Sequence, residues 1–328
     1  MNRAELISAK SHGFSSLVLG ELTLICVDQC LSGAKIASRM AQIKPWTVSD
    51  ALWRKIEPLV PKPKRERGRK YQRKPGAGRK PMPTRQVFAA IVYVLRTGCQ
   101  WKALPKEYGS ASAVHAYFQR WRREGSFLKI WKAGLAEYDE LEGIAWRWQS
   151  VDGASGKAPL AQECVGPNST DRGKMGANAA SWWTPVASRC RSSPAGPNRH
   201  GSYLLRATLA AIVCPRPDPR CGQIETLCAD AAYVGFPAQA ASRLHHYQLN
   251  VKTRRQERDE KQRDPDHKAR GWVVERTHSW FNRFRKLLIS FEKTEASYTA
   301  LLSLAAALIS WRQTVAIYGY VLILKASA

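Results

Sequence analysis

The spacing of apolar residues changes near Gly143, and this change most constrains what the chain can fold into. Before Gly143, apolar residues recur every three or four positions, which predicts helices; after it they alternate, which predicts strands. One strand is predicted within residues 144–154, with Asp152 at its carboxyl end. One face of this predicted strand carries Ile144, Trp146, Trp148, Ser150 and Asp152. We therefore expect a helical N-terminal part followed by an α/β part.

The helical part contains three predicted helices, over residues 84–97, 110–124 and 127–141, after a short helix that Ser49 caps and Pro58 ends. The middle helix is expected to bury Val114, Phe118 and Trp121. Its outward residues are His115, Gln119, Arg120, Arg122 and Arg123. A basic outer face on the middle of three helices favours a helix-turn-helix-like module. A small helical bundle without DNA contacts fits the same pattern.

The chain is strongly basic, with 52 Lys and Arg against 26 Asp and Glu and a net charge of +26. Such a charge favours a polyanionic partner, nucleic acid before a membrane surface. Residues 62–80 hold ten basic residues and one acid, and Pro75 and three glycines oppose a regular helix there. This basic arm is a solvated linker or a phosphate-binding segment, and its charge density favours the second. Its predicted DNA-binding residues are Lys64, Arg65, Arg67, Arg69, Lys70, Arg73, Lys74, Arg79 and Lys80.

Several classes of protein are excluded by what the sequence lacks. No run of about 18 uncharged apolar residues could cross a membrane. No compact basic-then-apolar signal opens the chain. The eight cysteines form no Cys-x-x-Cys pair, which opposes a zinc site and fits a reducing cytoplasm. We expect a cytoplasmic protein.

Three acids stand at positions suited to metal binding. Asp152 and Asp230 each end a predicted strand, the second within residues 223–230, and Glu275 lies on the polar side of a helix predicted from about residue 272. Carboxylates at neighbouring strand ends, with one more on a packed helix, can hold two Mg²⁺ or Mn²⁺ ions. Such a pair activates an oxygen nucleophile and stabilises the leaving oxygen at a phosphodiester. Taken singly, each acid more commonly has a structural or surface role.

Six segments give the chain a family resemblance: WTVSDALWRKIEPLVP, TGCQWKALPKEYGSASAVHAYFQRWRREG, VDGASGKAPL, GPNSTDRGKMG, LCADAAYVG and WVVERTHSWFNRFRKL. Over residues 40–312 the chain resembles the insertion-sequence DDE transposases of bacterial family five. The resemblance implies a helical DNA-binding region over 40–142 and a ribonuclease-H-like catalytic domain over 144–312. It also implies catalytic and metal-binding roles for Asp152, Asp230 and Glu275, with two Mg²⁺ or Mn²⁺ ions.

The resemblance further implies that the protein binds inverted-repeat ends and target DNA as duplexes, cuts and joins DNA strands, assembles as a homo-oligomer on DNA and associates with the nucleoid. Arg276, Arg283 and Arg285 become candidates for phosphate contacts, or else are ordinary solvated charges. Two segments fall outside the pattern. Residues 1–39 are expected to be an extension foreign to the family. Residues 313–328 are a tail, either read-through sequence or a last core-packing segment.

Single positions also depart from the family. Related chains read Asp-Lys-Gly-Tyr where this one has Asp230 followed by two alanines and Tyr233, and they commonly have Lys at the position of Asn282. These differences bear on auxiliary residues more than on the three acids.

Two rivals to a transposase fit parts of the pattern. One is a non-catalytic DNA-binding protein that occupies element ends, and the other is a structural basic protein that binds RNA. Loss of metal-dependent cleavage on substituting Asp152 separates the first from an enzyme, and competition between inverted-repeat DNA and RNA separates the second.

The largest departure from the family pattern lies in residues 179–197, which read AASWWTPVASRCRSSPAGP. A ribonuclease-H-like sheet needs two more strands between the first two acids, but this segment has neither alternation nor a β-branched run. Trp182, Trp183 and Thr184 must be encoded by TGGTGGACN, which reads Val-Asp one base earlier. Permitted codons for the rest give RSLLVDARGVPLSLVAGGA, an apolar strand, a turn and another apolar strand. We hypothesise two compensating frameshifts, near Asn178 and Pro197, that leave this copy misfolded or inactive; a divergent loop is the alternative.

The nucleotide sequence of the gene tests this hypothesis. We expect the codons for residues 179–197, read one base earlier, to encode the alternative peptide. Codons that cannot encode it would leave the divergent loop as the explanation.

Overall fold

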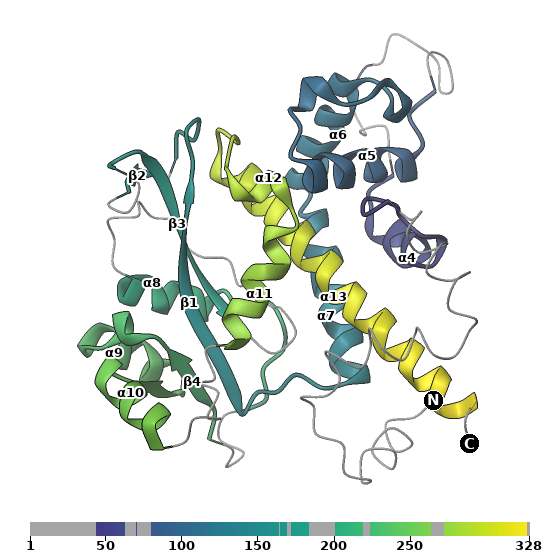
Figure 1. Cartoon of the computed structure of the whole chain (residues 1–328). Helices are drawn as coiled ribbons and strands as arrows, with labels where there is room; N and C mark the ends of the chain where they lie inside the picture. The colour runs from purple at the N-terminus through teal and green to yellow at the C-terminus, as the bar shows by residue number, and fades with distance from the viewer. Residues whose placement is uncertain are drawn as a thin grey trace.

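The computed structural model places a twisted sheet with its covering helices beside a group of helices drawn from both halves of the chain (Figure 1). The structure describes residues 44–62, 70, 80–163, 165–168, 172–183, 201–218, 224–263 and 272–326. Within them, the backbone alone is described at 154–155, 177–183, 201, 254, 257, 261, 272–276, 316 and 318–326. The predicted extension, 1–39, lies outside these ranges. So does the basic arm apart from residue 62 and the exposed Lys70 and Lys80.

The predicted N-terminal helices are confirmed. The Ser49 hydroxyl accepts a hydrogen bond from the Leu52 amide at 3.2 Å and caps the first helix. Gly98 ends another with a φ of 74°, a left-handed conformation that glycine adopts without strain. The helices are α4 (Asp50–Ile56), α5 (Thr84–Thr97), α6 (Ala111–Arg123) and α7 (Ser126–Leu141), with 3-10 turns at Glu57–Leu59, Trp101–Ala103 and Lys106–Tyr108.

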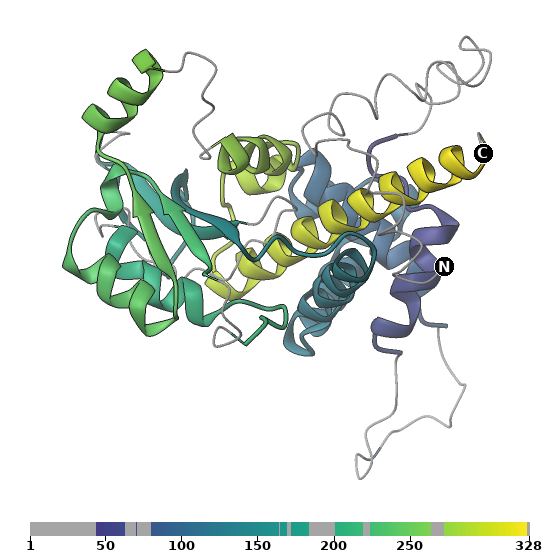
Figure 2. The same ribbon diagram turned by 90° about the horizontal axis from the view of Figure 1, so that it is seen from below.

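One long C-terminal helix, α13 (Glu295–Ala326), completes this helical group. It runs beside α7 (Figure 2), and the two approach closely where Gly134 faces the Trp311 indole. Residues 300–311 of α13 are buried on all sides of the helix and join α4, α5, α6 and α7 in one hydrophobic core. Of the predicted tail, Thr314 is fully buried and Ile317 packs against a second core, so at these positions the core-packing alternative holds.

The second core lies under a five-stranded mixed sheet in the order β2-β3-β1-β4-β5. Strands β1, β4 and β5 are parallel, and β3 is antiparallel to both β1 and β2. The strands are β1 (Trp148–Lys157), β2 (Gly166–Pro167), β3 (Met175–Trp183), β4 (Thr226–Ala229) and β5 (Gln248–Val251). The remaining helices are α8 (Gly201–Ala210), α9 (Phe236–Leu244), α10 (Arg254–Arg263), α11 (Trp272–Asn282) and α12 (Arg285–Leu288), with a 3-10 turn at Ala231–Tyr233.

Helices cover both faces of this sheet. Val151 of β1 and Leu227 of β4 are buried with residues of α8 and α9 in the second core. Because side chains alternate along a strand, Asp152 points to the opposite face, where α11 packs against β1 and β3 (Figure 1). The fold is mixed α/β, as predicted.

Two sequence-based expectations need correction. The strand predicted from Ile144 begins at Trp148, and it continues past Asp152 to Lys157 because β3 pairs with it over that whole length. Residues 179–183, expected to form no strand, are the second half of β3. The remainder of the segment, 184–197, lies outside the described residues. The basic stretch at 252–270, for which no element was predicted, contains α10.

A buried polar network ties the parallel strands together at the end of β1 opposite Lys157. The Gln149 amide donates to the Trp146 carbonyl at 2.8 Å, and the Tyr247 hydroxyl donates to Gln149 at 2.7 Å. The Glu225 carboxylate lies 3.4 Å from the Gln149 amide and accepts a 2.6 Å bond from Arg216. Because each polar group has a partner, burial of this network does not leave a charge unpaired.

Replacing the carboxylate of this network should destabilise the fold. We expect Glu225→Ala to lower the free energy of unfolding by about 3 kcal/mol, because it leaves the Arg216 guanidinium without its buried partner. The control is Glu124→Ala, which removes a solvated partner of Arg120 and should cost less than about 1 kcal/mol. Urea unfolding followed by circular dichroism measures both, and equal losses would contradict a structural role for the network.

Candidate functional site

The register of the parallel strands brings two of the three predicted acids together. Val151 of β1 pairs with Ala229 of β4. Asp152 and Asp230 directly follow these two residues, so they lie side by side on neighbouring segments of the backbone. Asp230 keeps an extended backbone, with a φ of −74° and a ψ of 173°. Both side chains therefore project from the face of the sheet on which α11 lies, on strands about 4.8 Å apart. The predicted convergence of these two acids is present in the structure.

Two contacts orient the carboxylate of Asp152. Its Oδ1 atom accepts a hydrogen bond from the Gly153 amide at 2.7 Å, and its Oδ2 atom lies 3.5 Å from Nε2 of His278. His278 belongs to α11, so this contact links the helix to the central strand. Although Asp152 lies within β1 and not at its end, β4 pairing stops at Val151, which leaves the carboxylate 36% exposed.

Tyr233 packs in the second core and lies close enough to the two carboxylates to feel their charge. Tyr233 is 1% exposed, and among the described residues its hydroxyl has no hydrogen-bond partner. Burial raises the pKa of Tyr233, and the negative charges of Asp152 and Asp230 raise it further. The hydroxyl therefore stays protonated and remains a hydrogen-bond donor beside the acids. Sequence reasoning did not select Tyr233 or His278, although each lies three residues from a predicted acid.

The third acid is placed by its backbone alone. Glu275 belongs to α11, as predicted, but its side chain is not described. Among the described side chains, no three acids, histidines or cysteines stand close enough to hold a metal ion. Mg²⁺ and Mn²⁺ prefer oxygen ligands such as carboxylates. The two adjacent acids, Asp152 and Asp230, are therefore chemically suitable ligands for either ion.

The predicted basic face of α6 is partly engaged within the protein. The Arg120 side chain donates to Glu124 at 2.8 Å and that of Arg122 to Gln119 at 2.8 Å, while Arg123 is exposed. Gln119, expected to face outward, also donates to the Ser297 hydroxyl of α13 at 3.3 Å. His115, likewise expected outside, packs against Trp101 with the rings tilted by 60° and their centroids 5.1 Å apart. These contacts correct the expected orientation of Gln119 and His115.

The remaining predicted DNA contacts are distributed around α11. The side chain of Arg276 is not described, while Arg283 and Arg285 are exposed on either side of Phe284, where α11 gives way to α12.

No helix in the described part of the chain has the length and apolar character needed to cross a membrane.

Comparison with known proteins identifies both parts of the chain. Residues 48–131 match a family described as "Putative transposase of IS4/5 family", and residues 227–312 match one described as "Transposase DDE domain". Asp230 and Glu275 lie inside the second match, whereas Asp152 lies between the two.

Two curated proteins of Burkholderia cepacia are similar to the chain. One, the insertion element IS402 uncharacterized 16.2 kDa protein, is 32% identical over 121 residues, which cover 36% of this chain and 78% of that protein. The other, described as a putative transposase for insertion sequence element IS402, is 50% identical over 40 residues, 12% of this chain and 19% of that protein. No solved structure matches. The chain belongs to the insertion-sequence DDE transposases, within the IS4/5 group.

Proposed function

We propose that this protein binds the ends of its insertion element and has the catalytic domain of an enzyme for metal-dependent cleavage and strand transfer of DNA, an activity that the altered segment 179–197 is expected to have abolished in this copy. The observation that carries the proposal is the register of β1 and β4, which sets Asp152 beside Asp230 on the sheet face that α11 covers. A mixed sheet with helices on both faces supports a ribonuclease-H-like catalytic domain. The divisions at residues 39, 142 and 312 stay predictions, as do oligomeric assembly on DNA and a cytoplasmic, nucleoid-associated location.

Glu275 is proposed as the third metal-binding acid. Position 275 precedes His278 by three residues, so the two positions share one face of α11. His278 contacts Asp152, which supports placing position 275 on the side of the helix that faces the sheet. Together Asp152, Asp230 and Glu275 would hold two Mg²⁺ or Mn²⁺ ions, which when bound would supply activation of an oxygen nucleophile and stabilisation of the leaving oxygen.

The protein's own groups have separate tasks in this mechanism. The Gly153 amide holds one oxygen of Asp152 and His278 lies against the other, so the carboxylate has a fixed orientation. The net charge of +26 draws the polyanionic substrate toward the site.

Substituting either described acid should abolish cleavage without abolishing DNA binding. In the chain whose residues 179–197 are replaced by the alternative peptide, we expect Asp152→Asn and Asp230→Asn each to lower the rate of Mg²⁺-dependent cleavage of a duplex carrying the element's own end by at least about 100-fold. Binding to the same duplex in EDTA should stay within about twofold of the parent, because neutralising an acid removes only repulsion toward phosphate. The matched control is Glu140→Gln, an exposed carboxylate on α7.

This measurement is made on two chains, the present one and one in which residues 179–197 are replaced by the alternative peptide. We expect the restored chain to cleave and the present chain to be inactive. Cleavage by the present chain would refute inactivation, and the acid variants would then be tested in it. If neither chain cleaves although both bind the element's end, the protein is a non-catalytic DNA-binding protein. Displacement of the DNA by RNA at equal concentration would favour the RNA-binding rival.

A further inference from the structure

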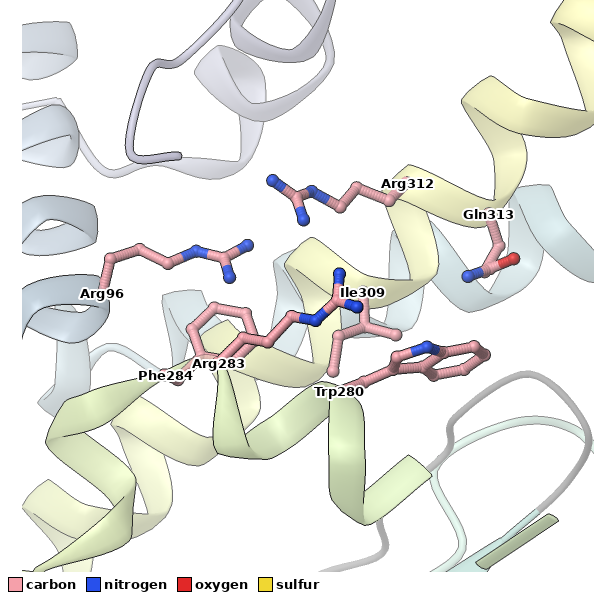
Figure 3. Close-up of a pocket in the computed structure, with 7 residues that line it drawn as sticks. All are labelled: Arg96, Trp280, Arg283, Phe284, Ile309, Arg312 and Gln313. Atoms are coloured by element: carbon pink, nitrogen blue, oxygen red, sulfur yellow. The ribbon is translucent and has the colours of Figure 1, made fainter. Parts of the chain in front are cut away.

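Three arginines from distant parts of the chain converge on one pocket (Figure 3). Arg96 comes from the last turn of α5, Arg283 from the turn after α11, and Arg312 from α13. The space that the lining residues enclose, open solvent included, is about 330 Å³. Its other lining residues are Trp280, Phe284, Ile309 and Gln313.

Arg96 is the buried member of this group. Its residue surface is 7% exposed, and its Nε has no hydrogen-bond partner among the described residues. Its guanidinium stacks on the Phe284 ring, 3.8 Å from the ring centroid, so its apolar face is satisfied while its N–H groups face the pocket edge. Burial is costly for a cation with an unsatisfied donor, which requires an anion or water as partner.

The arginines also repel one another. Burial, together with the charges of Arg312 and Arg283, lowers the pKa of Arg96 to about 9. Burial and the charge of Arg283 lower the pKa of Arg312 as well. No ion pair to any of the three is present among the described residues. Three like charges without a described acid form a site that binding of an anion would stabilise.

Packing keeps the arginines together despite this repulsion. A Cβ on Gly98 would lie 3.0 Å from Cβ of Arg285 and 3.1 Å from its backbone carbon, so the end of α5 touches the start of α12 directly. Phe281, Phe284 and Leu287, which flank Arg283 and Arg285, belong to the same core as α5 and α13. The pocket is therefore built into the contact between the N-terminal helices and α11.

We infer that Arg96, Arg283 and Arg312 together bind one backbone phosphate of the DNA substrate. The guanidinium groups match phosphate in charge and in hydrogen-bond geometry. The pocket lies next to the end of α11, seven residues beyond Glu275, or about 10 Å along the helix axis. That length equals roughly three nucleotide steps of a duplex strand at about 3.4 Å each, so one strand can reach both places. The inference rests on the proposed function for the identity of the polyanion.

The test is DNA binding by the full chain in EDTA, where no cleavage occurs, with a labelled duplex carrying the element's end and a series of salt concentrations. We expect Arg283→Gln and Arg312→Gln each to weaken binding severalfold. The double variant should lower the slope of log affinity against log salt by about 0.9, the value for one phosphate. Two independent contacts would lower it by about 1.8. The control is Arg243→Gln, an exposed arginine on α9, a helix that packs in the second core and not in the core around the pocket.

Several outcomes would overturn the inference. Binding by the double variant with the affinity and slope of the parent would exclude a phosphate contact here, and a slope change near 1.8 would exclude a shared phosphate. If inorganic phosphate raises the melting temperature of the parent but not of the double variant, while DNA binding is unchanged, the pocket is a small-anion site. Failure of the parent to bind DNA would overturn both this inference and the proposed function, whereas the other outcomes leave the proposed function standing.

Arg283→Lys and Arg312→Lys keep the charge at exposed positions, and partial recovery of affinity shows that the Gln variants lost a contact and not their fold.

Discussion

The parallel register of β1 and β4 is the constraint on which the site depends. A slip of one residue would turn Asp152 to the opposite face of the sheet, into the core with α8 and α9, and away from Asp230. The register is fixed on that face by burial of Val151 and Leu227. It is fixed at the start of the strands by the bonds among Gln149, Glu225 and Tyr247. A polar network that is buried at one end of two strands thus determines where two carboxylates emerge at the other.

The helical part of the protein is coupled to this sheet through α11 and α13. Residues at the end of α11 and throughout α13 share a core with the N-terminal helices, and α11 itself packs on β1 and β3. A buried ion pair strengthens the junction, since Lys286 lies 3.4 Å from Glu292, whose carboxylate also accepts from the Trp101 indole at 3.1 Å. Any DNA contact made by the N-terminal helices is consequently fixed in position relative to the helix that carries Glu275.

Local signals in the sequence predicted local structure well. Ser49 and Gly98 marked helix ends because capping depends on a few neighbouring residues, and Asp230 was found where the alternation of β4 stops. The extent of β1 could not be predicted in this way, because Asp152 lies within the strand only through pairing with β3, some thirty residues later. The same limit applies to Arg96 and Arg312. Each reads as an ordinary helical residue, and only the packing of α5 against α12 and α13 brings their charges together.

The arrangement of charge explains why a protein of this composition can fold before it meets its ligand. At Arg96, Arg283 and Arg312, like charges are held together by apolar contacts around Phe284, so their repulsion is a cost that hydrophobic burial offsets. At Asp152 and Asp230 the same holds for negative charge, with Val151 and Leu227 burial opposing it. Binding of DNA and metal in one complex would reduce the repulsion in both clusters. Phosphate would neutralise the arginines, and divalent cations would neutralise the acids. A ligand that binds only the folded state stabilises it, so DNA and metal should each add to the stability of the junction that α11 forms between the two clusters.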